Sequence, residues 1–280
     1  MLVTSIAALA VTALLGASPA ASDAPSPYQA AIHLSGKIGS RPSSSRNELR
    51  AHRYVARQFQ AAGLDVKVDS FQVPGRGQSR NVIGKLDRPG SCLVILMSHI
   101  DSVPPGHGAI DNASGVGALV GLAPRLASLD PACDVWLVAT GSEERQVTGL
   151  SYHAGAAALV KLVRSEGRAG DLRFALSLDE VGLGRRFYLR SPVSAVRGGV
   201  EGEILAASRR AGVTVHWARD SGTGNSDHRE FELAGLPGAV LEVWKGVFAC
   251  HHMACDRPRL LQKPAMKRAL RIAEEVVKGV

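Results

Sequence analysis

The hydrophobic positions of this chain fall into short, continuous runs separated by longer amphipathic segments. The three strongest runs span residues 93–97, 135–140 and 174–178 and are almost entirely apolar. Continuous rather than alternating apolar residues are typical of strands that are covered on both faces of a sheet. Two further runs, over 66–73 and 81–86, also predict strands. We therefore expect a central β-sheet with buried inner strands.

Helices are predicted around and between these strands. Ser45 and Glu48 have the spacing of a capping box, and apolar residues then recur at helical period. Segments 113–128 and 151–163 separate the three strong strands, and Pro124 should kink or end the first of them. The order strand, helix, strand, helix, strand predicts right-handed crossovers and a largely parallel sheet.

The C-terminal part continues this alternation. A helix is predicted over 199–211, strands over 213–217 and 239–243, and a last helix from about Pro264. The chain has 280 residues, 45% of them hydrophobic, so it can bury one large core, and no break in composition divides it. We expect a single α/β domain over residues 23–280.

The first 22 residues differ from the rest because they carry no charged side chain. An apolar stretch over 6–15 leads into the small-residue segment "GASPAAS", although no basic residue lies between Met1 and that stretch. This pattern predicts a secretory signal peptide over 1–22 that is cleaved near Ala20. The apolar stretch is shorter than the roughly 20 residues needed to span a bilayer. We therefore expect a secreted, extracellular protein without a membrane anchor.

The formal net charge of +8 adds little to this picture. The arginines are scattered, and only short pairs occur, such as Arg185 with Arg186. Nucleic-acid binding needs basic residues that are clustered on one face. We therefore interpret the charge as a solvated basic surface and predict no nucleic-acid partner.

The four cysteines fit an exported protein and allow three disulfide pairings. We favour Cys92 with Cys133, because each opens an apolar run. Cys250 with Cys255 would then close a tight loop. The alternative for each pair is a buried free thiol.

Acidic residues and histidines follow the three strong strands. The pairs are, in chain order, His99 and Asp101, Glu143 and Glu144 in "LVATGSEE", and Asp179 and Glu180 in "FALSLDE". In an open parallel sheet, ligands bind beyond the carboxyl ends of the strands. We expect the three pairs to meet at one edge of the sheet, joined by Asp111 and by the histidines of "ACHHMACD".

Such a cluster of carboxylates predicts a bound cation. Without one, the carboxylates would repel one another and their pKa values would rise. Imidazoles mixed with carboxylates suit zinc, whereas calcium prefers oxygen ligands alone. One catalytic zinc uses three protein ligands, and this cluster offers more than three. With one bridging carboxylate, five ligands give three to each of two zinc ions, which can then activate one water.

From about Gly39 to the C-terminus, the chain resembles the co-catalytic zinc aminopeptidases, metallopeptidase family twenty-eight, of the aminopeptidase Y and leucyl aminopeptidase type. The resemblance rests on "HID", "GAIDNASGVGAL", "GSEE", "SLDEVG", "SDHREFELAGLPG" and "HMACD", in that order. It implies a three-layer α/β/α fold of the phosphorylase/hydrolase-like zinc exopeptidases, with a mixed, mostly parallel central sheet. It also implies an enzyme that removes N-terminal residues from peptides with a water activated by two zinc ions.

The resemblance also implies roles for individual residues. Five are implied as metal ligands: His99 and Asp179 for one zinc, Glu144 and His252 for the other, and Asp111 as the bridge between them. Asp101 would orient the ring of His99 from behind. Glu143 would be the general base, which carries a proton from the attacking water to the leaving amine. The choice between the two adjacent glutamates is inherited from the family.

The chain departs from the family pattern at two places. The stretch after the paired glutamates, "RQVTGLSYHAG", is longer and altered. His251 stands where relatives often have a tyrosine that supports the tetrahedral intermediate. An imidazole would take that task, or His251 would itself be the ligand; Asp256, four residues after His252, favours His252 as the ligand.

Several other residues have two interpretations. Asp227 and His228 either line or buttress the substrate cleft, or they begin a helix that Ser226 caps. The remaining histidines without acidic neighbours in the sequence are interpreted as structural or surface residues; they include His33, His52, His153 and His216.

Two other functions remain open. Glutaminyl-peptide cyclases share this fold and much of the ligand set but use a single zinc. Receptor ectodomains use the fold as a binding module without catalysis, although a binding surface has no need for Glu143 beside Glu144. We expect a monomer that acts on peptide substrates.

Overall fold

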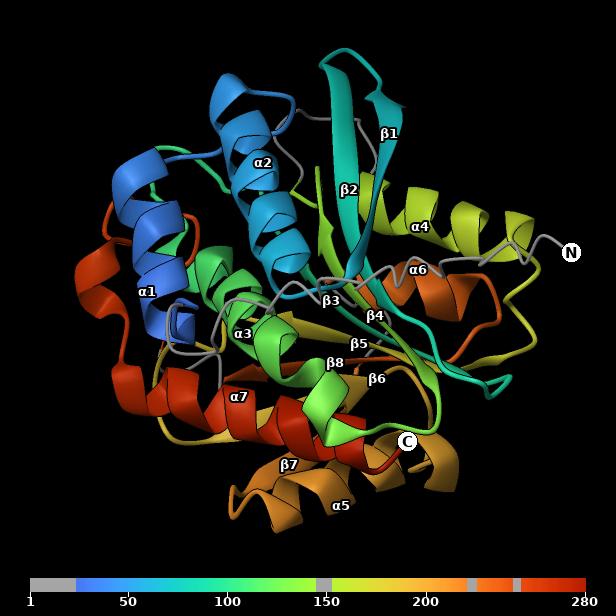
Figure 1. The fold of residues 1–280 in the computed structure, drawn as a ribbon. Helices are drawn as coiled ribbons and strands as arrows, with labels where there is room; N and C mark the ends of the chain where they lie inside the picture. The colour runs from blue at the N-terminus through green and yellow to red at the C-terminus, as the bar shows by residue number, and fades with distance from the viewer. Residues whose placement is uncertain (1–23, 145–152, 221–225, 244–247) are drawn as a thin grey trace, which may run out of the picture.

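A computed structural model describes residues 24–144, 153–220, 226–243 and 248–280 (Figure 1). The expected signal peptide lies outside these residues, as do most of the altered stretch after the paired glutamates and the predicted helix start at 151–152. Within the described ranges, no helix has both the length and the apolar character needed to cross a membrane.

The centre of the molecule is one eight-stranded sheet with the strand order β1-β2-β4-β3-β5-β8-β6-β7. The strands are β1 (Asp65–Val73), β2 (Gly77–Leu86), β3 (Leu93–His99), β4 (Asp134–Thr140), β5 (Leu172–Asp179), β6 (Phe187–Ser191), β7 (Val215–Arg219) and β8 (Gly238–Val243). The inner strands β4, β3, β5 and β8 run parallel, while β2 joins β4, and β6 joins β8, in antiparallel fashion. The sheet is therefore mixed and mostly parallel at its centre, as expected.

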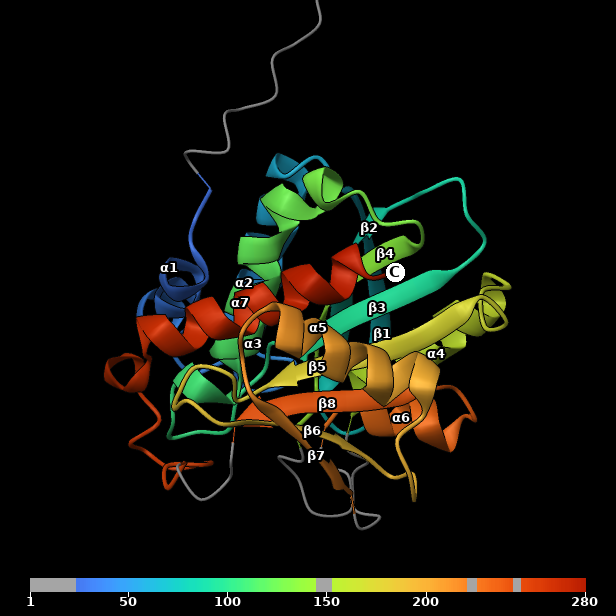
Figure 2. The ribbon, with the colours of Figure 1, turned by 90° about the horizontal axis from the view of Figure 1, so that it is seen from below.

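Helices cover both faces of the sheet (Figures 1 and 2). They are α1 (Pro27–Ile32), α2 (Arg46–Ala61), α3 (Ser114–Leu122), α4 (Ala154–Ser165), α5 (Glu203–Arg210), α6 (His228–Leu233) and α7 (Lys263–Lys278). The larger core lies under α1, α2, α3, α5 and α7, and includes Phe59, Leu119 and Ile272. The smaller core lies under α4 and α6, and includes Trp136 and Phe231. Two cores on opposite faces confirm the three-layer α/β/α fold.

Most predicted helices form, but their ends differ. Helix α3 ends at Leu122, and Pro124 lies in a 3-10 turn that follows it, as the proline predicts. The predicted helix over 199–211 is a π-turn at Gly198–Gly202 followed by α5. Helix α1 and strand β6 were not predicted, because both are too short for hydrophobic periodicity to identify.

The predicted capping box forms only in part. The Oγ of Ser45 accepts the backbone N–H of Glu48 at 3.1 Å. The Glu48 carboxylate instead accepts the N–H of Ser44 at 2.7 Å, the hydroxyl of Ser79 at 2.8 Å and the N–H of Ser142 at 3.1 Å. Glu48 thereby ties α2 to the loop that carries the paired glutamates.

Both predicted disulfides are present. Cys92 pairs with Cys133 next to the starts of β3 and β4, and Cys250 pairs with Cys255. The second disulfide closes the loop that contains His251 and His252, two of the predicted site residues.

Candidate metal centre

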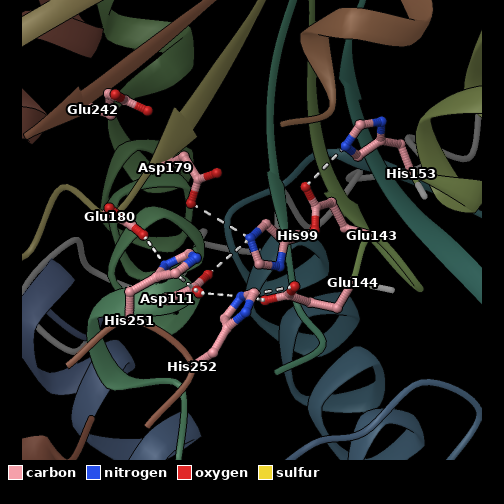
Figure 3. Close-up of a pocket in the computed structure, with 10 residues that line it drawn as sticks. All are labelled: His99, Asp111, Glu143, Glu144, His153, Asp179, Glu180, Glu242, His251 and His252. Carbon is pink, nitrogen blue, oxygen red and sulfur yellow. Dashed lines mark hydrogen bonds and ion pairs between the residues drawn. The ribbon is translucent and has the colours of Figure 1, made fainter. Parts of the chain in front are cut away.

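The carboxyl ends of β3, β4, β5 and β8 meet at one edge of the sheet, where they form a cavity of about 260 Å³ (Figure 3). Acidic and imidazole side chains line this cavity: His99, Asp111, Glu143, Glu144, His153, Asp179, Glu180, Glu242, His251 and His252. The five predicted ligands, the predicted base Glu143 and His251 therefore come together in space. Their segments are as much as 153 residues apart in the sequence, from His99 to His252.

Asp111 lies between the two histidines that were predicted to bind different ions. Its Oδ1 lies 3.2 Å from the Nε2 of His99, and its Oδ2 lies 3.2 Å from the Nε2 of His252. Each oxygen therefore faces a different imidazole, which is the arrangement that a bridging carboxylate needs.

His99, Asp111 and His252 thus form a row, and the two remaining predicted ligands lie beside it. The Oδ1 of Asp179 lies 3.4 Å from the Nε2 of His99. Both carboxylate oxygens of Glu144 lie 3.0 Å from the Nε2 of His252. Within the described part of the chain, three groups of residues have ligand atoms within 4.8 Å of one another: His99, Asp111 and Glu144; His99, Glu143 and Asp179; and Asp111, His251 and His252.

The donor set fits zinc. It combines imidazole nitrogens with carboxylates, the mixture that zinc prefers. The buried Oδ1 of Asp179 has no hydrogen-bond partner among the described residues, although it lies beside His99. Burial, and then the negative charge of Asp111, raise the pKa of Glu144 well above its usual range. A cation between these carboxylates would offset that cost and leave Glu144 ionised.

The same carboxylates also raise the pKa of His252. Burial alone would lower the pKa of His252, but hydrogen bonds with Asp111 and Glu144 raise it to about 11. Asp111 is buried as well, yet its hydrogen bonds with His252 and His99 hold its pKa below the usual range. Without a metal ion, a proton on imidazole supplies the positive charge that these carboxylates require.

Asp101 lies behind the row of predicted ligands and is fully buried. Its Oδ1 lies 3.7 Å from the Nδ1 of His99, and its backbone carbonyl lies 3.3 Å from the same nitrogen. Its carboxylate also accepts the backbone N–H groups of Glu143 at 2.9 Å and Glu144 at 3.1 Å. Asp101 therefore lies beside one predicted ligand and fixes the turn that carries both glutamates.

The loop between β3 and Asp111 is held by a buried arginine and a buried aspartate. The Arg41 guanidinium donates to the carbonyls of Ile100 at 2.6 Å and Gly108 at 2.9 Å. The Asp256 carboxylate accepts the N–H of Asp111 at 3.2 Å. Gly108 has φ 56°, and a Cβ at this position would collide with the carbonyl oxygen of Asp111. These contacts fix the position of Asp111. Gly108 opens the motif "GAIDNASGVGAL", whereas no sequence pattern indicated Arg41.

His251 lies beside the row but faces another carboxylate. Its Nδ1 lies 2.6 Å from the Oε1 of Glu180 and 3.4 Å from the Oδ2 of Asp111. The hydrogen bond with Glu180, the largest cause, raises the pKa of His251. With a side chain that is 55% exposed, His251 lies at the mouth of the cavity, where it can contact a substrate.

The two adjacent glutamates point in different directions, as Figure 3 shows. Glu144 faces His252, whereas the Oε1 of Glu143 lies 3.3 Å from the Nε2 of His153. The premise that His153 has no acidic neighbours is therefore wrong, because its second nitrogen also lies 3.2 Å from Glu230. This contact crosses 77 residues, so local sequence could not indicate it.

The other three histidines fit the structural or surface interpretation. The ring of His33 stacks on Tyr54 at a centroid distance of 4.1 Å. His52 is buried in α2, and His216 is exposed on β7 beside Tyr188.

Asp227 and His228 lie behind the cavity wall rather than at its surface. They are 0% and 1% exposed, and neither is among its described lining residues. Asp227 accepts the hydroxyl of Thr140 at 2.5 Å, so it buttresses the end of β4. The structure therefore agrees with the interpretation that these residues buttress the cleft and not with the interpretation that they line it. A helix does begin here, but Ser226 bonds to the Ser177 hydroxyl at 2.8 Å instead of capping it.

Glu242 lines the cavity and was not predicted. It lies near the end of β8 and pairs with Arg190 at 2.7 Å. A signal was present, because Glu242 is the one acidic residue of the predicted strand over 239–243 and stands next to its last position.

Two known proteins are similar to this chain in sequence. The chain is 27% identical over 305 aligned positions to leupeptin-inactivating enzyme 1 of Streptomyces exfoliatus, covering 95% of this chain and 66% of that protein. It is 29% identical over 167 positions to aminopeptidase YwaD of Bacillus subtilis, covering 58% of this chain and 35% of that protein. The chain thus matches less than two-thirds of the length of either relative.

A solved structure of BSAP, a zinc aminopeptidase from Bacillus subtilis, has the same fold. The TM-score is 0.80 at 16% identity, over 90% of this chain and 93% of that one. The family described as "Peptidase family M28" matches residues 81–277, which is more than half of the chain and includes every predicted metal ligand. The chain therefore belongs to peptidase family M28.

Proposed function

We propose that this chain is a secreted, monomeric aminopeptidase that hydrolyses the N-terminal peptide bond of its substrates with two zinc ions. The observation that carries the proposal is the position of Asp111, which turns one oxygen to His99 and the other to His252. His99 with Asp179 would hold one ion, and Glu144 with His252 would hold the other. When bound, the two ions supply Lewis acidity for activating water and polarising the scissile carbonyl.

Glu143 is the proposed general base. Its side chain is only 5% exposed and lies between His99 and His153 (Figure 3), outside the contact between Glu144 and His252. From this position it takes a proton from the attacking water and returns it to the leaving amine. Asp101 supports this step by holding the backbone of Glu143.

Cleavage at the N-terminus is supported by the charge of the cavity. Six of its lining residues are carboxylic acids: Asp111, Glu143, Glu144, Asp179, Glu180 and Glu242. Three of them, Glu143, Glu180 and Glu242, are not proposed zinc ligands, and their charge complements the protonated amino group of a peptide and disfavours its carboxylate end. The name of aminopeptidase YwaD, a relative at 29% identity, supports the same reaction. Secretion is supported by the two disulfides, which form and persist in oxidising compartments.

The proposal is tested by the release of N-terminal residues from a panel of aminoacyl chromogenic substrates, with and without a chelator. We expect release that the chelator stops and that added zinc restores. Glu143→Gln should abolish turnover and retain the zinc content of the wild type, whereas Glu275→Gln, a matched change on the surface of α7, should leave activity unchanged. Loss of zinc in Glu143→Gln would instead assign Glu143 as a ligand.

Two results would replace this function with an alternative. Cyclisation of N-terminal glutamine without aminoacyl release would identify a glutaminyl-peptide cyclase. Bound zinc with neither activity would identify a binding module.

A further inference from the structure

His153 occupies an unusual place at the start of α4. It has a left-handed backbone conformation, with φ 56°, and its residue is only 3% exposed. Its backbone N–H donates to the carbonyl of Glu143 at 2.8 Å, and the next N–H, of Ala154, donates to the carbonyl of Ser142 at 2.9 Å. A non-glycine residue rarely adopts this conformation, so the surrounding structure must hold it there.

The ring of His153 connects two carboxylates from different elements. Its Nε2 lies 3.3 Å from the Oε1 of Glu143, and its Nδ1 lies 3.2 Å from the Oε1 of Glu230 on α6. Both ring nitrogens are thereby committed, and the ring cannot rotate without losing both contacts. Burial alone would lower the pKa of His153, but the bonds with Glu143 and Glu230 raise it to about 10, which favours the doubly protonated ring.

The contacts differ in their distance from solvent. The Glu143 side chain is 5% exposed, whereas the Glu230 side chain is 22% exposed. Figure 3 shows His153 on the side of Glu143 that faces away from His99. The ring therefore supports Glu143 from behind.

We propose that His153 is a positioning residue for Glu143: its ring, itself oriented by Glu230, holds the Glu143 carboxylate in the direction of the reacting centre. This inference rests on the proposed function, in which Glu143 is the general base. The competing explanation is that His153 only closes the turn before α4. That role depends on its backbone N–H, which every substitution except proline keeps.

The two explanations are separated by steady-state kinetics. His153→Leu removes both ring contacts, and a misplaced base lowers kcat by on the order of 100-fold. KM should change less than about twofold, because a fault confined to the chemical step leaves substrate binding intact. Zinc content should equal that of the wild type. His153→Gln, whose amide can still donate toward Glu143, should recover most of the lost kcat, and His216→Leu on β7 is the control.

A double-mutant cycle shows whether His153 acts through Glu143. Glu143→Asp shortens the side chain and withdraws it from the ring, so adding His153→Leu to it should cost less than about threefold. Equal losses of kcat in both backgrounds would overturn the proposal. A lower unfolding temperature with unchanged kcat would overturn it too.

A crystal structure of the His153→Leu protein gives a readout that does not depend on turnover. The proposal expects the Glu143 carboxylate to leave its wild-type orientation while Glu144 and His252 stay in place. An unmoved carboxylate would contradict the positioning role even if the wild type is active. A displaced carboxylate in a protein without aminopeptidase activity would uphold the positioning role and reject the proposed function.

Discussion

The carboxylate of Asp101 accepts the backbone N–H of Glu143 at a distance of 2.9 Å. It binds the next N–H, of Glu144, at 3.1 Å and also lies beside the ring of His99. One buried side chain therefore connects the ends of two neighbouring parallel strands, β3 and β4. The relative positions of a predicted ligand and of the predicted base depend on it.

Asp101→Asn should weaken both functions of this residue. An amide has one oxygen for two N–H donors, and its own NH₂ group would face one of them. We expect a loss of about 10- to 100-fold in zinc affinity or in kcat/KM, as for other groups that orient metal ligands. Competition titration with a chelator and steady-state kinetics measure the two quantities.

The control for this change is Asp65→Asn, which removes the same charge from an exposed position on β1. Both quantities should stay at wild-type values in that protein. An Asp101→Asn protein as active and as tightly metallated as the control would show that Asp101 orients nothing.

The sheet and most of the candidate site could be predicted from the sequence. Strands β3, β4 and β5 are buried on both faces, so they appear as continuous apolar runs, and the polar residues after them stand out. Parallel strands bring those residues to one edge. The same reasoning explains why His99, Glu144 and Asp179 were predicted together.

The residues that sequence reasoning missed or misplaced depend on contacts between distant elements. His153 gains its role from Glu230, which lies on another helix. Asp227 and His228 follow no strand that would place them at the cavity, and the packing of α6 turns both inward. Hydrophobic periodicity carries no information about either effect.

The two disulfides should affect different properties. By loop-closure entropy, the Cys92–Cys133 bond across 41 residues contributes about 4 kcal/mol and the Cys250–Cys255 bond across 5 residues about 2 kcal/mol. Replacing the first pair by serine should therefore lower the free energy of unfolding more. Replacing the second should lower zinc affinity more, because that loop carries His252. Urea unfolding and zinc titration compare the two proteins, and equal effects on both properties would contradict this division.

The free energy of unfolding should fall at acid pH because His52 is buried in its neutral form. Burial, and then the positive charge of Arg80, lower the pKa of His52 from 6.5 to about 3. Below pH 6.5, His52 binds a proton in the unfolded chain but stays neutral in the folded protein. The free energy of unfolding is therefore unaffected by this proton above pH 6.5. Between pH 6.5 and pH 3 it falls by about 1.4 kcal/mol per pH unit.

His52→Leu should remove this pH dependence. We expect the free energies of unfolding of wild type and His52→Leu, measured in urea, to converge or cross between pH 6.5 and 4. The exposed substitution His216→Leu should give a curve parallel to the wild type. A parallel curve for His52→Leu would mean that His52 takes up a proton in the folded protein.

Asp111→Asn tests the proposed bridge. Asp111 faces both His99 and His252, so its loss should lower the occupancy of both ions rather than of one. Asp179→Asn, which alters a group beside His99 only, should mainly affect a single ion. Metal analysis after dialysis measures both variants, and an Asp111→Asn protein that keeps two zinc ions would contradict the bridging role.

The most direct test of the central claim is the zinc content of purified, dialysed wild-type protein, measured by mass spectrometry of the metal against protein concentration. Two ions bound between His99, Asp111, Glu144, Asp179 and His252 predict two zinc per chain. One zinc per chain, stable to further addition of zinc, would contradict the account.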